Sequence, residues 1–288
     1  MKHSISDRLF SIIIAAVLAL IAIVTFFPFY YVLVVSFTEP SEYLSKPFIL
    51  FPRQWSFQSY EYLLTTKSFV RALSNSAFLA TVGTACSLVV TAALAYPLSR
   101  RRMRGRRKIM MMILFTILFG PGMIPSYMLV RDIGLINSIW SLIIPALASG
   151  WNVILMRGFF DSIPTELEES AAMDGCNDLS IWFRIIIPLS LPSLAAFGLF
   201  YAVGYWNQFF SAILYLNQPE KWPIQVFLQN MLITATNSEL NSDVYAQPPP
   251  SETLKMAAVI IATVPILAVY PFLQKHFAKG AMVGSVKG

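Results

Sequence analysis

The sequence has very little charge for its length. Only 12% of its 288 residues are charged, 56% are hydrophobic, and the mean hydropathy is +0.62. Soluble domains carry about 25% charged residues, so a water-soluble protein of this size could not cover its surface with so few. The apolar residues also gather in long runs. The composition therefore excludes an ordinary soluble domain and predicts an all-α membrane protein.

Cysteine and histidine are almost absent. Cys86 lies in an apolar run and Cys176 in a polar segment, so the two are expected in different layers and unable to form a disulfide. The two histidines, His3 and His276, lie near opposite ends, and no Cys/His cluster has metal-ligand spacing. We expect no metal, haem or other cofactor in this chain. The surplus of six positive charges does not indicate a nucleic-acid partner, because in a membrane protein the position of charges matters more than their sum.

Six apolar runs are long enough to cross a bilayer, which takes about 20 residues of helix. They predict six transmembrane helices at residues 9–35, 72–98, 109–130, 138–156, 185–216 and 256–273. The fifth run is longer than a bilayer requires, so we expect part of it to be broken or to lie outside the membrane. Prolines within several runs favour kinks. The whole chain, 1–288, is expected to form one transmembrane domain.

Basic residues orient these spans. Seven of the nine residues from Arg100 to Lys108 are Arg or Lys, and positively charged loops stay in the cytoplasm. This places the N- and C-termini on the cytoplasmic side, together with residues 161–184. A basic run is usually only a topology signal, with binding to anionic membrane lipid as a further possibility. The outer segments, 36–71, 131–137 and 217–255, either dock an extracellular partner or pack over the helix ends.

The six spans contain no Asp, Glu, Lys, Arg or His. Ion-coupled carriers keep such groups inside the membrane as relays, so a carrier of that class is not expected. The energy for any transport would then come from outside the bilayer. A membrane anchor or sensor that transports nothing stays open as an alternative, while a channel is disfavoured because no charged ring or filter motif occurs.

Uncharged polar and aromatic residues do occur in the spans. Aromatic rings stack on sugar rings and amides bond to hydroxyls, so they are candidates for a path taken by a polyhydroxylated solute. The alternative is that they anchor helices at the membrane interface or join them by hydrogen bonds. The substrate-path candidates are Tyr127, Asn152, Tyr205, Trp206, Asn207 and Gln208.

The segment 161–184 contains six of the fifteen acidic residues and the clearest local pattern. Asp161 or Ser162 is predicted to cap a helix, with Pro164 in its first turn and three glutamates favouring its N-terminal dipole. Gly175 is predicted to end that helix. Ser180 is then predicted to cap a second short helix over 181–187. Together these predict a helix-turn-helix across the cytoplasmic face.

Here the residues match a known pattern. Glu169-Ser170-Ala171-x-x-x-Gly175, followed by nine residues and Ile185-x-Ile187-Pro188, resembles the EAA loop of type I ATP-binding-cassette importer permeases. That family has Glu-Ala-Ala-x-x-x-Gly-x9-Ile-x-Leu-Pro, so Ser170 and Ile187 are mild departures. The flanking residues and the tail resemble the carbohydrate-uptake branch that includes the smaller maltose-transporter permease, over nearly the whole chain.

The resemblance implies a type I importer permease fold and a coupling helix that docks on an ATPase. The implied docking residues are Glu169, Ser170, Ala171, Asp174 and Gly175, with Lys287 and Gly288 of the tail as secondary candidates. It further implies a heterodimer with a second permease, two ATP-binding-cassette subunits that hold ATP and Mg, and an extracytoplasmic solute-binding protein. The chain has no phosphate-binding Gly-x-x-x-x-Gly-Lys-Ser/Thr loop, so it is not itself expected to be an enzyme.

The expected function is therefore import of an oligosaccharide across the cytoplasmic membrane of a bacterium. The nearest alternative keeps the architecture and changes the cargo to a peptide, an amino acid or an anion. No residue of the sequence separates these cargoes.

Overall fold

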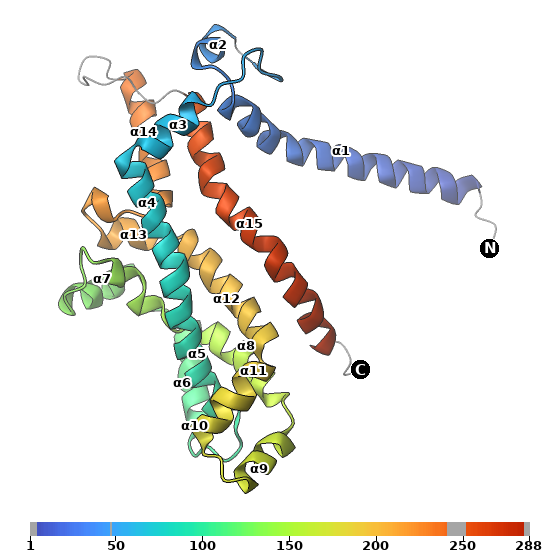
Figure 1. Ribbon diagram of the computed structural model, residues 1–288, viewed down its shortest axis with the longest axis vertical. Coiled ribbons are helices and arrows are strands. Elements are labelled where there is room, and N and C mark those ends of the chain that lie inside the picture. Colours follow the sequence, from blue (N-terminus) through green and yellow to red (C-terminus); the bar gives the residue numbers. More distant parts are fainter. Residues whose placement is uncertain (1–4, 47, 241–251, 285–288) are drawn as a thin grey trace. The chain divides into compact units, whose positions relative to one another are not determined.

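The computed structural model describes residues 5–46, 48–240 and 252–284 (Figure 1). Regular structure in these residues is helical, and the one sheet-like pairing among them is an isolated antiparallel bridge between Thr38 and Trp55. The chain divides into two compact units. The smaller contains Met1–Lys67 and Leu228–Thr263, and the larger contains Ser68–Phe227 and Val264–Gly288. The helices α14 (Ile224–Leu240) and α15 (Glu252–Gly284) begin in one unit and end in the other.

The smaller unit opens with the long helix α1 (Ile5–Ser36). Every side chain from Phe10 to Phe29 is exposed, as suits an apolar helix surrounded by lipid. The short helices α2 (Pro40–Ser45) and α3 (Gln58–Thr65) follow. The buried hydroxyl of Ser59 donates to that of Thr253 over 3.3 Å, which joins α3 to the first turn of α15.

A single carboxylate organises the segment between α2 and α3. Glu42 accepts hydrogen bonds from the ammonium of Lys46 at 2.5 Å and from the backbone N–H groups of Arg53 at 3.0 Å and Gln54 at 3.1 Å. The Lys46 hydrogen bond, helped by the two backbone donors, lowers the pKa of Glu42 below its ordinary value of 4.5. The charged form of Glu42 therefore holds this segment in place.

The larger unit contains most of the helices. Its first three elements, α4, η1 and α5, form one continuous helix with a π turn at η1. The bounds are α4 Lys67–Phe78, η1 Leu79–Gly83, α5 Thr84–Ser99, α6 Arg106–Leu118, α7 Met123–Asp132, η2 Ile139–Leu142, η3 Ile144–Ala146, α8 Gly150–Asp161, α9 Thr165–Met173, α10 Asp178–Ile181, η4 Trp182–Ile186, α11 Ile187–Leu189, α12 Leu191–Trp206, α13 Phe210–Tyr215 and η5 Pro219–Lys221.

The six predicted spans correspond to three continuous helices and three bent pairs. The continuous candidates are Phe10–Ser36, Lys67–Ser99 and Glu252–Val269. The bent pairs are Arg106–Leu118 with Met123–Asp132 at 115°, Ile139–Ala146 with Gly150–Asp161 at 49°, and Asp178–Leu189 with Leu191–Trp206 at 79°. Six spans result if each pair counts as one. The expected break in the fifth span is confirmed, and it falls at Ser190.

The sharpest bend has a local cause. Between α6 and α7 the chain reads Gly120-Pro121-Gly122, and Pro121 has no N–H to continue the helical ladder. Gly122 has φ +79° and ψ 175°, a conformation that side-chain-bearing residues avoid. The predicted third span is consequently two helices rather than one.

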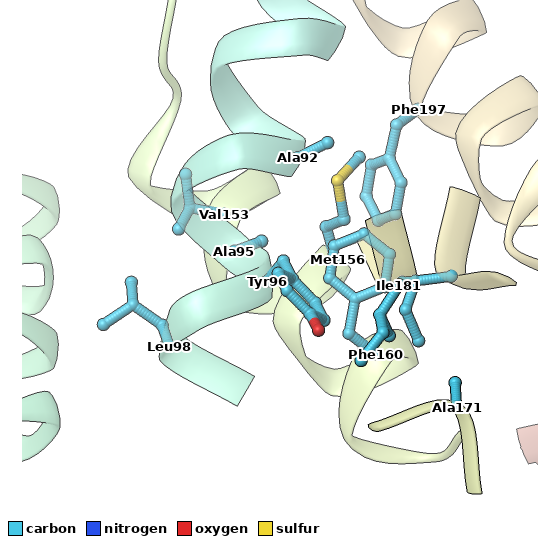
Figure 2. Packing of buried hydrophobic residues seen from close by; sticks show 11 residues of the cluster. Ala92, Ala95, Tyr96, Leu98, Val153, Met156, Phe160, Ala171, Ile181 and Phe197 are labelled. Carbon is cyan, nitrogen blue, oxygen red and sulfur yellow. The ribbon is translucent and has the colours of Figure 1, made fainter. Parts of the chain in front are cut away.

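Helix α5 is the centre of packing in the larger unit, where α8 and α12 lie against it. Tyr201 and Tyr205 of α12 bond through their hydroxyls to Thr91 at 2.7 Å and Ser87 at 2.8 Å on α5. Two apolar clusters fill the interior, and Figure 2 shows the one near the C-terminal end of α5, where Tyr96, Met156 and Ile181 converge. This cluster lies beside α9 and α10, which Figure 1 places at the same end of α5.

Gly83 leaves room for an aromatic ring. A Cβ at Gly83 would lie 2.9 Å from ring atoms of Tyr205, whose hydroxyl is fixed by Ser87. We predict that Gly83→Ala destabilises the protein by about 1–3 kcal/mol, because the ring cannot move away without breaking that bond. Thermal unfolding of the purified protein in detergent measures the effect. Gly158→Ala is the control, since nothing lies within 4 Å of a Cβ there; equal losses in both variants would contradict the explanation.

The Glu42 contacts give a pH-dependent prediction. Because the folded pKa lies below the unfolded one, the stabilisation is complete above about pH 4.5 and is lost as the pH falls through the folded pKa. Limited proteolysis of residues 37–57 is expected to accelerate on acidification in the native protein. In Glu42→Gln it is expected to be fast already at neutral pH and to change little. An unchanged acid response in Glu42→Gln would contradict this assignment.

Candidate functional site

The candidate site is the segment from α9 to α11, at the end of the larger unit that also carries the arginine-rich residues. Helix α9 begins at Thr165 after Pro164, with Glu166 and Glu168 in its first turn. No side chain caps this end. The predicted cap at Asp161 or Ser162 is therefore wrong: the Ser162 hydroxyl instead donates to Phe159 O at the end of α8, and the two acidic residues alone complement the helix dipole.

The end of α9 is fixed by Gly175, as predicted. Its φ of +86° is the left-handed conformation that favours glycine. The N–H of Cys176 donates to Ala171 O and that of Gly175 to Ala172 O, both over 3.0 Å. These two bonds form a Schellman motif, which satisfies the last carbonyls of the helix. The turn sends the chain directly into α10.

The second helix starts three residues earlier than predicted. Helix α10 begins at Asp178, and the Asn177 side chain accepts from the N–H of Ser180 over 2.8 Å. Asn177 is thus the cap and Ser180 is already inside the helix. The prediction of Ser180 as cap is wrong because an asparagine at the preceding turn competes better for the same free N–H groups. The helix then continues through a π turn, η4, into α11.

Helix α9 has two different faces. Glu168 and Ala171, three residues apart, are buried against the rest of the unit, and Ala171 belongs to the cluster of Figure 2. The opposite face is exposed and includes an apolar residue, Met173, that is 90% exposed. Of the predicted docking residues, Ala171 lies inward, and four are exposed: Glu169, Ser170, Asp174 and Gly175. Lys287 and Gly288 lie outside the described residues.

The arginine-rich segment does more than mark topology, because its side chains form ion pairs beside the candidate site. Arg102 meets Asp178, the first residue of α10, at 2.5 Å, and Arg106 meets Asp161 at 3.5 Å. Asp161 also contacts Arg157 at 3.2 Å. Partial desolvation opposes the charge of Arg102, but the hydrogen bond and charge of Asp178 outweigh it and raise the pKa of Arg102.

Arg100 and Glu168 form the one buried pair of this group, at 2.5 Å with side chains 7% and 10% exposed. Neither residue was among the predicted site residues. A sequence signal did exist: Glu168 and Glu169 are adjacent on a helix, so they cannot both point the same way, and an inward carboxylate in a membrane protein calls for a cation.

The substrate-path candidates are spread over several environments. Tyr205 and Trp206 are buried, and Tyr205 bonds to Ser87. Gln208 donates to Leu142 O at 3.1 Å, and Tyr127 stacks on Tyr215 with centroids 6.4 Å apart. Asn152 is buried on α8, whereas Asn207 is exposed and accepts from Gln225 at 3.3 Å. The structure thus brings Tyr205 and Gln208 to the packing of α12 against α5 and η2, and leaves Asn207 accessible.

Among the residues that the structure describes, no group of three or more His, Cys, Asp or Glu side chains is placed to hold a metal ion.

The comparisons with known proteins agree with this architecture. Residues 87–283 match the sequence profile of the family described as binding-protein-dependent transport system inner membrane component. The chain belongs to this family. It is 46% identical to the polygalacturonan/rhamnogalacturonan transport system permease protein YtcP of Bacillus subtilis, over 98% of this chain and 99% of that one. The predicted resemblance to carbohydrate-importer permeases is confirmed.

Two solved structures extend the comparison. A chain of a bacterial ABC transporter involved in the import of the acidic polysaccharide alginate superposes with a TM-score of 0.87 and 34% identity, covering 96% of this chain and 99% of that chain. A chain of the bacterial alginate ABC transporter in complex with an alginate pentasaccharide-bound periplasmic protein has a TM-score of 0.56 at 18% identity, covering 94% and 96%. The latter shows the fold alone. The protein is therefore a membrane-embedded transport component with the fold of an ABC importer permease.

The contrast between Tyr205 and Asn207 can be tested. Tyr205→Phe removes a buried hydroxyl and leaves Ser87 unpaired, so it is expected to lower stability by about 1–3 kcal/mol without changing the KM for the transported solute. Asn207→Ala is expected to leave stability unchanged, because its side chain is exposed. Thermal unfolding and transport kinetics of the two variants separate the effects. A raised KM in Tyr205→Phe at native stability would contradict the packing role.

Proposed function

We propose that this chain is one permease subunit of an ATP-driven importer that moves an oligosaccharide across the bacterial cytoplasmic membrane. In this proposal a second, similar permease completes the pore. Two ATP-binding-cassette subunits, which hold ATP and Mg, bind on the cytoplasmic side. An extracytoplasmic solute-binding protein delivers the oligosaccharide, and the chain itself hydrolyses nothing.

The exposed face of α9 is the observation that carries the proposal. One face of this helix is held by the subunit through Ala171 and Glu168, while the other presents a carboxylate, Glu169, beside small residues and the exposed Met173. Leu167 and Met173 are 43% and 90% exposed, so α9 presents two large apolar side chains that a partner protein would cover. The small residues allow close approach, and Glu169 can pair with a basic group of an ATPase.

The side on which this contact lies follows from charge. The arginine-rich residues lie next to α9, and such segments stay in the cytoplasm, where ATP is available. Both termini then lie on the same side. Closure of two ATPase subunits on ATP would draw the two coupling helices together and open the cavity between the permeases outward.

The proposed cargo rests on two observations. The relative in Bacillus subtilis is named for polygalacturonan and rhamnogalacturonan, and the solved relative for alginate, so an oligosaccharide is the class of solute. The spans add uncharged amide and aromatic side chains, which suit hydroxyl-rich solutes. Uptake of labelled oligosaccharides from these polymers, compared with peptides and amino acids, tests the class.

Gly175 provides the test of coupling. Gly175→Val forces a β-branched residue into the left-handed conformation, at a cost of about 1–2 kcal/mol, and distorts the turn that ends α9. A Cβ at this position meets nothing within 4 Å, so the subunit's own packing is not disturbed. We expect solute transport and solute-stimulated ATP hydrolysis to fall together in the reconstituted complex, while the complex still assembles.

Gly175→Asn is the matched variant, because asparagine tolerates the left-handed conformation. It is expected to keep more activity than Gly175→Val if the geometry of the turn is what matters. Undiminished transport in Gly175→Val would contradict the assignment of α9 as the coupling helix.

A further inference from the structure

The buried ion pair between Arg100 and Glu168 stands apart from the other charge contacts near α9. Arg100 is the first residue after α5, and Glu168 lies on the inner face of α9. Their side chains are 7% and 10% exposed, whereas those of Arg102 and Asp178 are 60% and 68% exposed. The guanidinium of Arg100 also lies over the ring of Tyr96, 4.9 Å from its centroid. The pair is therefore enclosed within the subunit.

Such a pair is a poor way to gain stability. Removing two charges from water costs several kcal/mol per ion, and an apolar replacement of similar volume is often equally stable or better. The geometry here is not that of a saturated network, because Arg100 Nε lacks a hydrogen-bond partner, and Arg100 Nη2 and Glu168 Oε1 contact each other in the ion pair without a further hydrogen bond. A purely structural account therefore leaves the presence of this pair unexplained.

Unsatisfied polar atoms concentrate at this place. Of the eight buried side-chain atoms without a hydrogen bond among the described residues, six lie here, although two of these, Arg100 Nη2 and Glu168 Oε1, are joined to each other in the ion pair. They belong to Tyr96, Arg100 (two atoms), Arg157, Glu168 and Trp182. Cavities of about 780 Å³ and 460 Å³ adjoin Arg100, the first lined also by Glu168 and the second by Tyr96 and Trp182. Orphaned groups beside free volume mark a place where side chains can exchange partners.

The position of the pair suggests its use. Helix α9 is joined along the chain to α8 on one side and to α10 on the other, but α5 lies more than sixty residues earlier in sequence. The ion pair ties α9 to the end of α5. Farther along α5, Ser87 and Thr91 bond to Tyr205 and Tyr201 of α12. The helix α5 thus contacts α9 through the ion pair at its C-terminal end and α12 through two hydroxyl contacts farther along, all within the larger unit.

We propose that Arg100 and Glu168 are the positioning pair through which displacement of α9 is transmitted to α5, and that their contact is required for ATP hydrolysis to move solute. The inference rests on the proposed function of α9. Without the pair, α9 still docks on the ATPase subunit and ATP is still hydrolysed, but α5 no longer moves when α9 is displaced. The effect is a loss of coupling, not of assembly or of hydrolysis.

The test uses the complete transporter in proteoliposomes and measures solute moved per ATP hydrolysed. In the double variant Arg100→Met/Glu168→Leu, apolar side chains of similar size replace the pair. We expect thermal stability at or above the native level and a ratio lowered by about tenfold or more, in the range of a typical coupling energy. The single variant Glu168→Gln is expected to lower the same ratio, and the double variant decides the question if the single one fails to fold.

The exposed pair provides the control. Arg102→Gln/Asp178→Asn removes a contact of the same 2.5 Å length, two residues along the chain from Arg100 but exposed to solvent, and the ratio is expected to change little. A double variant Arg100→Met/Glu168→Leu that couples as well as the native complex would overturn the inference. Absence of transport in the native complex would instead overturn the proposed function, so the two failures are distinguishable.

Discussion

The contact of Arg100 with Glu168 fixes which face of α9 the subunit keeps and which it presents. Because Glu168 points inward and is neutralised there, Ala171 on the same face can enter the apolar cluster of Figure 2. Glu169, one residue on, is then turned outward by the 100° step of a helix. The internal charge contact and the exposed docking face therefore lie on opposite sides of the same helix.

Charge and its absence also divide the larger unit along its length. The predicted spans carry no Asp, Glu, Lys, Arg or His, so the charged side chains lie beyond them, and four of the described ion pairs gather around α9, α10 and the end of α8. All four involve arginine, whose planar guanidinium is weakly hydrated and suits an enclosed site. Toward the middle of the helices, α5 and α12 are joined instead by contacts between hydroxyl groups, such as that of Thr91 with Tyr201.

Much of the fold could be predicted from apolar run length alone, because a bilayer sets that length. What could not be predicted is where a span breaks. Pro97 lies inside α5 and Pro28 inside α1 without a break, whereas Pro121 stands between glycines and the chain turns by 115°. A proline only removes one hydrogen bond; the adjoining Gly122, with φ +79°, supplies a conformation that redirects the chain. The bend needs both.

The geometry of the candidate site could be predicted where a single residue determines it. It could not be predicted where two neighbouring residues could fill the same structural role. Gly175 ends α9 as predicted, since the left-handed position leaves few alternatives. Asn177 and Ser180 could each cap the next helix, and only the path of the turn gives Asn177 the free N–H groups. The sequence alone does not distinguish Glu168 from Glu169, because they are adjacent residues of the same type. Glu168 is the buried one because it pairs with Arg100, which lies 68 residues earlier in the chain. Which of the two glutamates is exposed therefore depends on a long-range contact, because Arg100 pairs with Glu168 and leaves Glu169 on the outer face of α9.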